Sequence, residues 1–98
     1  MQDIDIDKID NSNDASWVLA DSGQRLTTEQ LDRLIGLVET NDDAGYVLAH
    51  ATQQLIPEQT DRLIGLIDTS EDAGYVLAHA RQPLTPEQVE RLKIIKGA

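Results

Sequence analysis

Apolar residues recur with a helical period in segments that alternate along the chain. In residues 27–39 the apolar positions Leu31, Leu34, Ile35 and Val38 follow the i, i+3, i+4, i+7 spacing of a helix with one buried face. The segments 56–68 and 85–96 occupy equivalent places, and the last of them begins Thr-Pro-Glu-Gln. That start places Thr at the N-cap, Pro at the first helical position and Gln three residues after the cap. We therefore predict helices over 27–39, 56–68 and 85–96.

A second kind of helix precedes each of these segments. We expect it over 41–52 and 70–81, where Thr40 and Thr69 stand at the N-cap position with an Asp three residues on. Asn11 and Asp14 start the first copy in the same way. Each unit is thus predicted to contain two helices.

The two-helix unit is repeated with a period of 29 residues. A shift of that length places 14–20, the sequence Asp-Ala-Ser-Trp-Val-Leu-Ala, over the two copies of Asp-Ala-Gly-Tyr-Val-Leu-Ala at 43–49 and 72–78. A fixed period of this size is typical of stacked repeat proteins. We therefore predict an all-α fold, a short right-handed helical-repeat solenoid of three 29-residue two-helix units. It forms one domain over 1–98, with an N-terminal cap at 1–10 and repeats at 11–39, 40–68 and 69–98.

The N-terminal segment 1–10 allows two interpretations. Ile6 and Ile9 align with Ile35 and Val38, which indicates a leftover second helix that caps the stack. Residues 4–7, Ile-Asp-Ile-Asp, alternate like a strand instead. We favour the helix.

Composition and charge narrow the functional classes. The chain has no cysteine, which favours a reducing compartment such as the cytoplasm, in a bacterial host if the gene is carried by a phage. It shows neither a signal peptide nor an apolar run of transmembrane length, so no membrane is expected. Eighteen acidic residues against eight basic ones give a formal charge of −10, which disfavours direct nucleic-acid binding and favours a partner protein with a basic surface.

The repeat resembles known helical-repeat families. Residues 84–89, Leu-Thr-Pro-Glu-Gln-Val, lead into an aliphatic helix, and the unit as a whole is similar to bacterial HEAT-like and leucine-rich-variant repeats. Its Leu-Thr-Pro-Glu-Gln start also resembles the opening of a TAL-effector repeat. That family has longer units, a base-reading pair between the helices and basic residues along the DNA. Segments 21–24 and 51–54 contain no such pair and the net charge has the opposite sign, so the resemblance implies a fold and not DNA reading.

Acidic residues recur at every junction between units. The 29-residue register brings them to one edge of the predicted stack, where doubled acids at each step of about 8–10 Å approximate the charge density of a phosphate row. The alternative is that they cap helix N-termini and maintain solubility. The candidate partner-binding residues are Asp10, Asp14, Glu39, Asp42, Asp43, Asp68, Glu71 and Asp72.

Three other recurring positions have simpler explanations. Glu58 and Arg62, with their equivalents, form i, i+4 pairs within the second helices. His50 and His79 form a column too widely spaced for one zinc ion, so neither a metal nor another cofactor is expected. Trp17 and its equivalents Tyr46 and Tyr75 favour partial burial in the core over an aromatic stripe for a partner.

The sequence contains no catalytic motif, so we expect a binding protein and not an enzyme. The leading hypothesis is a small acidic inhibitor that mimics DNA and occupies the basic nucleic-acid-binding surface of a target, as phage proteins that block CRISPR or restriction complexes do. The alternative is a helical-repeat adaptor that binds a protein or peptide through its apolar and aromatic face. Either would be a monomer or a weak homodimer.

Overall fold

The described part of the chain is all-helical. A computed structural model describes residues 6–21, 25–51 and 53–97, and within these ranges every regular element is a helix. The short 3-10 helix η1 (Ile6–Lys8) comes first. Six α-helices follow, α1 (Ser12–Asp21), α2 (Thr28–Leu37), α3 (Asn41–His50), α4 (Pro57–Leu66), α5 (Ser70–His79) and α6 (Pro86–Gly97).

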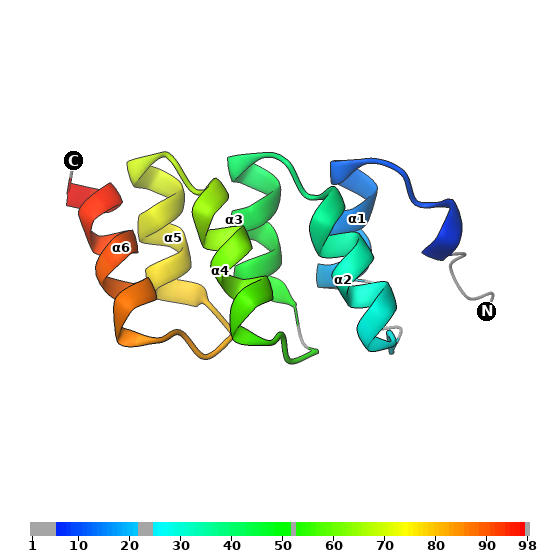
Figure 1. The fold of residues 1–98 in the computed structure, drawn as a ribbon. Coiled ribbons are helices and arrows are strands. Elements are labelled where there is room, and N and C mark those ends of the chain that lie inside the picture. The colour runs from blue at the N-terminus through cyan, green and yellow to red at the C-terminus, as the bar shows by residue number, and fades with distance from the viewer. Residues whose placement is uncertain (1–5, 22–24, 52, 98) are drawn as a thin grey trace.

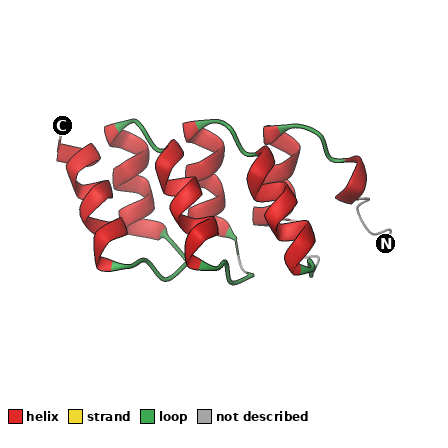
Figure 2. Ribbon diagram, in the orientation of Figure 1, coloured by secondary structure: helices red, strands yellow, loops and turns green. Residues whose placement is uncertain are grey.

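The α-helices form two layers. Helices α1, α3 and α5 contact one another in that order, α2, α4 and α6 do the same, and each odd-numbered helix also packs against the even-numbered helix that follows it. The segments that lead into α1, α3 and α5 lie along one edge, and those that lead into α2, α4 and α6 lie along the opposite edge (Figures 1 and 2). The molecule measures 43 × 20 × 20 Å and is longest in the direction in which the helices succeed one another.

An aliphatic core lies between the layers. Leu48 of α3, Leu34 of α2 and Leu63 of α4 have no exposed surface, and Leu92 extends the same core into α6. The small residues Ala44 and Gly45 are also buried, which allows α3 to approach its neighbours closely. Burial of these side chains supplies the main favourable free energy for packing the six helices together.

The N-terminal cap is partly described. Ile6 is 3% exposed and belongs to the core, and Ile9 packs against it, as their alignment with Ile35 and Val38 predicts. The backbone at Ile6–Lys8 forms a single 3-10 turn instead of the expected regular helix. Residues 1–5, which include the first half of the alternating segment, lie outside the described residues.

The helices are shorter than the apolar pattern predicts. Helices α3 and α5 end at His50 and His79 instead of 52 and 81, because the backbone angles of the C-cap residues Ala51 and Ala80 are no longer helical. Helices α2 and α4 end at Leu37 and Leu66, since the next residue of each is extended. Val38 and Ile67, the residues that follow α2 and α4, remain buried. The apolar period therefore continues past the point where the chain turns toward the next helix. Helix α6 continues to Gly97.

The predicted Thr caps are confirmed. The Thr85 hydroxyl accepts from the Gln88 N–H at 3.1 Å, and the Gln88 side chain accepts from the Thr85 N–H at 2.9 Å. Thr27 and Gln30 form the same capping box. Ile56 has no hydroxyl, so α4 retains only the half in which the Gln59 side chain accepts from the Ile56 N–H.

Glutamines 29 residues apart join successive copies at the edge where α2, α4 and α6 begin. The Gln53 amide accepts from the Leu26 N–H at 2.9 Å and donates to the Leu26 carbonyl at 2.7 Å. Gln82 is 5% exposed, accepts from the Leu55 N–H at 2.9 Å and donates to the Ala51 carbonyl at 2.9 Å. These side-chain amides therefore supply hydrogen-bond partners for backbone N–H and carbonyl groups of the loops, which lie outside the regular hydrogen bonding of the helices.

The arginines of the second helices perform a similar task at the other edge. The Arg62 guanidinium donates to the Ile35 and Gly36 carbonyls at 3.2 and 2.9 Å, near the end of α2. Arg33 donates to the Ile6 and Ile9 carbonyls at 2.8 and 2.7 Å. Each of these two guanidinium groups therefore reaches back to the preceding copy and donates to backbone carbonyls near the end of a helix.

Candidate partner-binding surface

The eight acidic residues singled out from the sequence lie along one edge of the molecule. All of them stand in or just before the first turns of α1, α3 and α5, at the edge where η1, α2 and α4 lead into these helices (Figure 1). The positive end of each helix dipole faces this edge, so these carboxylates stabilise the helices as well as charging the surface.

Asp43 and Asp72 are occupied by contacts between copies. The Ser12 hydroxyl accepts from the Glu39 N–H at 2.9 Å and donates to the Asp43 carboxylate at 2.7 Å, linking α1 to the start of α3. Asn41 repeats this link one copy later. Its side-chain oxygen accepts from the Asp68 N–H at 2.8 Å and its amide nitrogen donates to the Asp72 carboxylate. These two acids therefore hold the helices in position.

Asp14 closes the start of its own helix instead. Its N–H donates to the Asn11 side-chain oxygen at 2.8 Å, and its carboxylate accepts from the Asn11 amide nitrogen at 3.0 Å. The remaining five acids are exposed. Asp10 accepts from Asn11 and Asp42 accepts from Asn41, and Asp42 also interacts with Asp72 of α5. This open set is Asp10, Glu39, Asp42, Asp68 and Glu71.

Two carboxyl groups from neighbouring helices come close together on this edge. Burial raises the pKa of Asp72 above its ordinary value, and the carboxyl group of Asp42 raises it further, while hydrogen bonds from Asn41 and Thr69 oppose the change. The carboxyl groups of Asp42 in α3 and Asp72 in α5 therefore face each other here.

A row of rings runs across the exposed side of the α1, α3 and α5 layer. Trp17 is 51% exposed, and Tyr46 and Tyr75 are 37% and 38% exposed, so the rings line the surface while the neighbouring valines enter the core. The Tyr46 ring centroid lies 4.6 Å from that of His50, and the Tyr75 ring centroid lies 4.9 Å from that of His79. The sequence favours partial burial of these three rings in the core. Of the three, Trp17 is more exposed than this interpretation predicts.

Hydrogen bonds between copies fix the two tyrosines. The Tyr46 hydroxyl donates to the Asp21 carboxylate, and this hydrogen bond with Asp21 raises the pKa of Tyr46. The Tyr75 hydroxyl lies 2.7 Å from His50 Nε2. Tyr46 thus contacts Asp21, the last residue of α1, and Tyr75 contacts His50, the last residue of α3. The two rings are therefore held in place before any partner binds.

A groove between α1 and α3 combines both features. It is lined by Asn13, Ser16, Trp17, Asp42, Asp43 and Tyr46. Two exposed rings from successive helices and the open Asp42 carboxylate therefore share one depression. The 29-residue register places the same kinds of residue between α3 and α5, where Asp42, Tyr46, Glu71, Asp72 and Tyr75 recur.

The other layer carries acids that the sequence interpretation left out of the partner-binding set. Each of α2, α4 and α6 has two exposed acids three residues apart, and both keep the 29-residue register. They are Glu29 and Asp32, Glu58 and Asp61, and Glu87 and Glu90. The same helices contain three arginines and two lysines, Arg33, Arg62, Arg91, Lys93 and Lys96.

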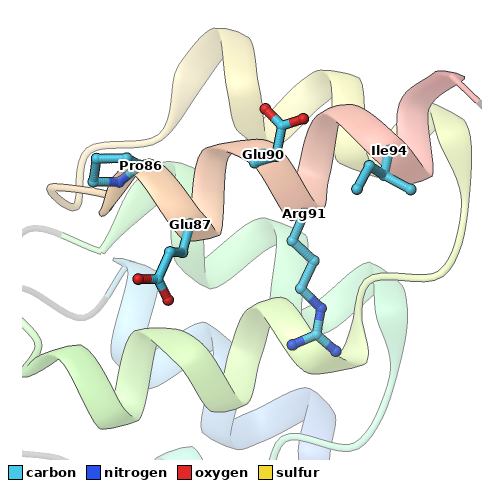
Figure 3. A pocket seen from close by; sticks show the side chains of 5 residues that line it. All are labelled: Pro86, Glu87, Glu90, Arg91 and Ile94. Atoms are coloured by element: carbon cyan, nitrogen blue, oxygen red, sulfur yellow. The ribbon is translucent and has the colours of Figure 1, made fainter.

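Helix α6 illustrates the mixed charge of that layer. A depression on its surface is lined by Pro86, Glu87, Glu90, Arg91 and Ile94, and Figure 3 shows Glu87 and Arg91 extending from the same side of the helix. Ile94 is 65% exposed. Acid and base stand side by side here, so this depression presents no single sign of charge to a partner.

Within the described ranges, no three histidine, cysteine or acidic side chains are grouped so that they could hold a metal ion. The described helices are also too short or too polar for any of them to cross a membrane. Comparison of the chain with family models, curated proteins and solved structures found no match.

Proposed function

We propose that this chain is a small acidic inhibitor that binds another protein on its basic, nucleic-acid-binding surface and thereby acts as a DNA mimic. One observation carries the proposal. The helices α1, α3 and α5 contain six acidic residues and no Lys or Arg, a formal charge of −6, whereas α2, α4 and α6 contain six acidic and five basic residues, a formal charge of −1. The negative field is therefore strongest on one layer, which is where a basic surface would dock.

Size supports the same proposal. In the proposed architecture, a right-handed solenoid of three 29-residue units, the acids succeed one another along the long axis. That axis measures 43 Å, slightly more than one turn of B-DNA at roughly 34–36 Å. A target groove shaped to hold one turn of duplex could thus accept the whole acidic edge. A CRISPR or restriction complex in the cytoplasm of a bacterial host is the kind of target we propose.

The acids that test this proposal are the exposed ones on this edge. Asp43 and Asp72 hold neighbouring copies together, so their substitution would confuse loss of folding with loss of binding. The quadruple variant Glu39→Gln, Asp42→Asn, Asp68→Asn, Glu71→Gln removes four charges from exposed side chains on the edge. The matched control Asp32→Asn, Glu58→Gln, Asp61→Asn, Glu90→Gln removes four exposed charges from the other layer.

The experiment has two stages. Proteins retained by the immobilised chain from a bacterial lysate are identified at low and at physiological salt, and each purified candidate is then bound to labelled duplex DNA and titrated with the chain. We expect wild type and control to displace the DNA and the edge variant to fail, with displacement weakening as salt rises. A salt-resistant partner that binds no nucleic acid, or equal loss in both variants, would overturn the proposal.

The exposed rings favour a second candidate function. Trp17 is 51% exposed on a surface helix, and aromatic residues are prominent among those that dominate protein interfaces. An adaptor that binds a protein or peptide through this row would retain its partner in the edge variant and at high salt, but would lose it on substitution of Trp17. The two functions therefore give opposite results in the same assay.

A further inference from the structure

The groove between α1 and α3 offers more than negative charge. Its walls are the Trp17 and Tyr46 rings, both exposed, and its rim carries Asp42. The Asp43 carboxylate in the same groove is half-buried and accepts from Ser12, whereas Asp42 is exposed and is the carboxylate that a ligand can reach. An aromatic face beside an exposed carboxylate is the environment in which a guanidinium group is held, by stacking on the ring and by paired hydrogen bonds to the acid.

The groove is also organised in advance. Tyr46 is fixed from both sides, by its hydrogen bond to Asp21 and by ring contact with His50. A side chain that is already held loses little further freedom on binding, so its contacts contribute more to affinity. Tyr75 is held in the same way by His50 and His79, so the equivalent position between α3 and α5 shares this property.

The second position is the more acidic of the two. Asp42, Glu71 and Asp72 stand there with the two tyrosines, and the Asp42 and Asp72 carboxyl groups lie close enough to repel each other. A cation placed between them would relieve that repulsion. Charge complementarity therefore favours a positively charged side chain at both positions.

We propose that these two positions bind two arginine side chains of one extended partner segment, spaced as Arg-x-x-Arg. The inference deepens the proposed function, on which it rests, by naming the side chains of the partner that are recognised. Neighbouring packed helices lie about 8–10 Å apart. In a polyproline II segment, residues i and i+3 lie on the same side and about 9 Å apart, which matches that separation. An Arg-x-Arg segment places its side chains at a different spacing and on different sides.

The test uses blocked, fluorescein-labelled peptides that contain Arg-Pro-Pro-Arg, Arg-Pro-Arg or Lys-Pro-Pro-Lys, with equal net charge. Polarisation gives Kd with the full chain, and the fluorescence of Trp17, the sole tryptophan, reports entry into the groove. We expect the Arg-Pro-Pro-Arg peptide to bind at least about threefold more tightly than the other two, with a saturable change in Trp17 fluorescence.

Variants locate the binding position. Trp17→Ala and Asp42→Asn should each raise Kd about three- to fivefold, and Asn13→Arg, which places a guanidinium in the groove, should raise it at least as much. Asp61→Asn on the opposite layer removes the same charge as Asp42→Asn and should leave Kd unchanged. Circular dichroism confirms that each variant is folded.

The outcomes separate this inference from the proposed function. Equal affinity for all three peptides, an unchanged Trp17 signal at saturation, or equal effects of Asp42→Asn and Asp61→Asn would overturn the inference. The proposed function would still stand if the chain displaced DNA from a partner in those circumstances. Spacing-dependent peptide binding in the groove without displacement of DNA from any partner would support the inference and count against DNA mimicry.

Discussion

The two helix layers contain the same number of acidic residues but differ in the residues that accompany them. Helices α1, α3 and α5 combine six acids with exposed rings and no Lys or Arg, while α2, α4 and α6 combine six acids with five basic residues. In the second layer the Arg33 and Arg62 guanidinium groups lie against carbonyls of the preceding copy. The positive charge of these arginines therefore stays within the second layer and offsets the negative charge of its carboxylates.

The comparison teaches that a count of acids does not locate a binding surface. Acidic residues recur at a 29-residue period in both layers, and the net field differs because the five basic residues of the α-helices all belong to one of them. Even within the acidic edge, Asp43 and Asp72 serve the fold, whereas Asp42 and Glu71 are exposed to a partner. Variants that perturb one layer at a time test this division.

The largest expected effect comes from the core that both layers share. Leu48→Ala in α3 and Leu63→Ala in α4 each remove a side chain with no exposed surface and should each lower the free energy of unfolding by about 2–5 kcal/mol. Urea denaturation followed by circular dichroism measures the change. Ile94→Ala, at a 65% exposed position, is the control and should change it by less than about 0.5 kcal/mol. Two separate transitions would contradict a common core.

A smaller loss is expected where a buried amide joins two copies. Gln82→Ala should lower the free energy of unfolding by about 1–3 kcal/mol, because the Leu55 N–H and the Ala51 carbonyl lose their partner away from water. Gln54→Ala provides the control, since Gln54 is exposed. The same denaturation experiment applies, and equal effects of the two substitutions would show that the amide carries no structural role.

A gain of stability is expected at the start of α4. Ile56 is 47% exposed and stands where Thr27 and Thr85 cap the equivalent helices of the same layer. Ile56→Thr should therefore raise the free energy of unfolding by about 1 kcal/mol, and Thr85→Ile should lower it by about the same amount. Thermal denaturation of the two variants checks both signs. A loss in both would mean that Ile56 contributes more by packing than a cap would.

The smallest effect concerns pH and belongs to the acidic layer. Burial and the neighbouring Asp42 raise the pKa of Asp72, so in the window above its ordinary value of about 3.9 the folded chain holds a proton that the unfolded chain has lost. The stability contributed by this group is complete below that value and is lost as pH rises through the raised pKa. Asp72→Asn should therefore flatten the fall in stability over this window.

Urea midpoints measured from pH 3 to pH 7, as roughly the window in which carboxyl groups titrate, provide the test of Asp72. Glu71→Gln removes the same charge from the adjacent exposed residue and serves as the control. An identical pH profile in the two variants would show that Asp72 does not titrate abnormally.

Local sequence chemistry determined the helices and their register. The apolar period placed six α-helices in the right order, and Thr85 with Gln88 marked a helix start to within one residue, because caps and amphipathic faces are properties of a few neighbouring residues. The alignment of Ile6 with Ile35 also placed Ile6 in the core. The helix ends were predicted less well, since Val38 and Ile67 stay buried after the helices have stopped.

Only the tertiary structure decided which side chains are available to a partner. The sequence presents Asp42 and Asp43 as equals, but the Ser12 hydroxyl, 31 residues from Asp43, occupies one and leaves the other exposed. Likewise Arg62 stands beside an acid in its own helix, yet its guanidinium reaches the carbonyls at the end of α2. Such contacts depend on how neighbouring copies pack, a relation between residues far apart in the chain that local sequence patterns do not specify.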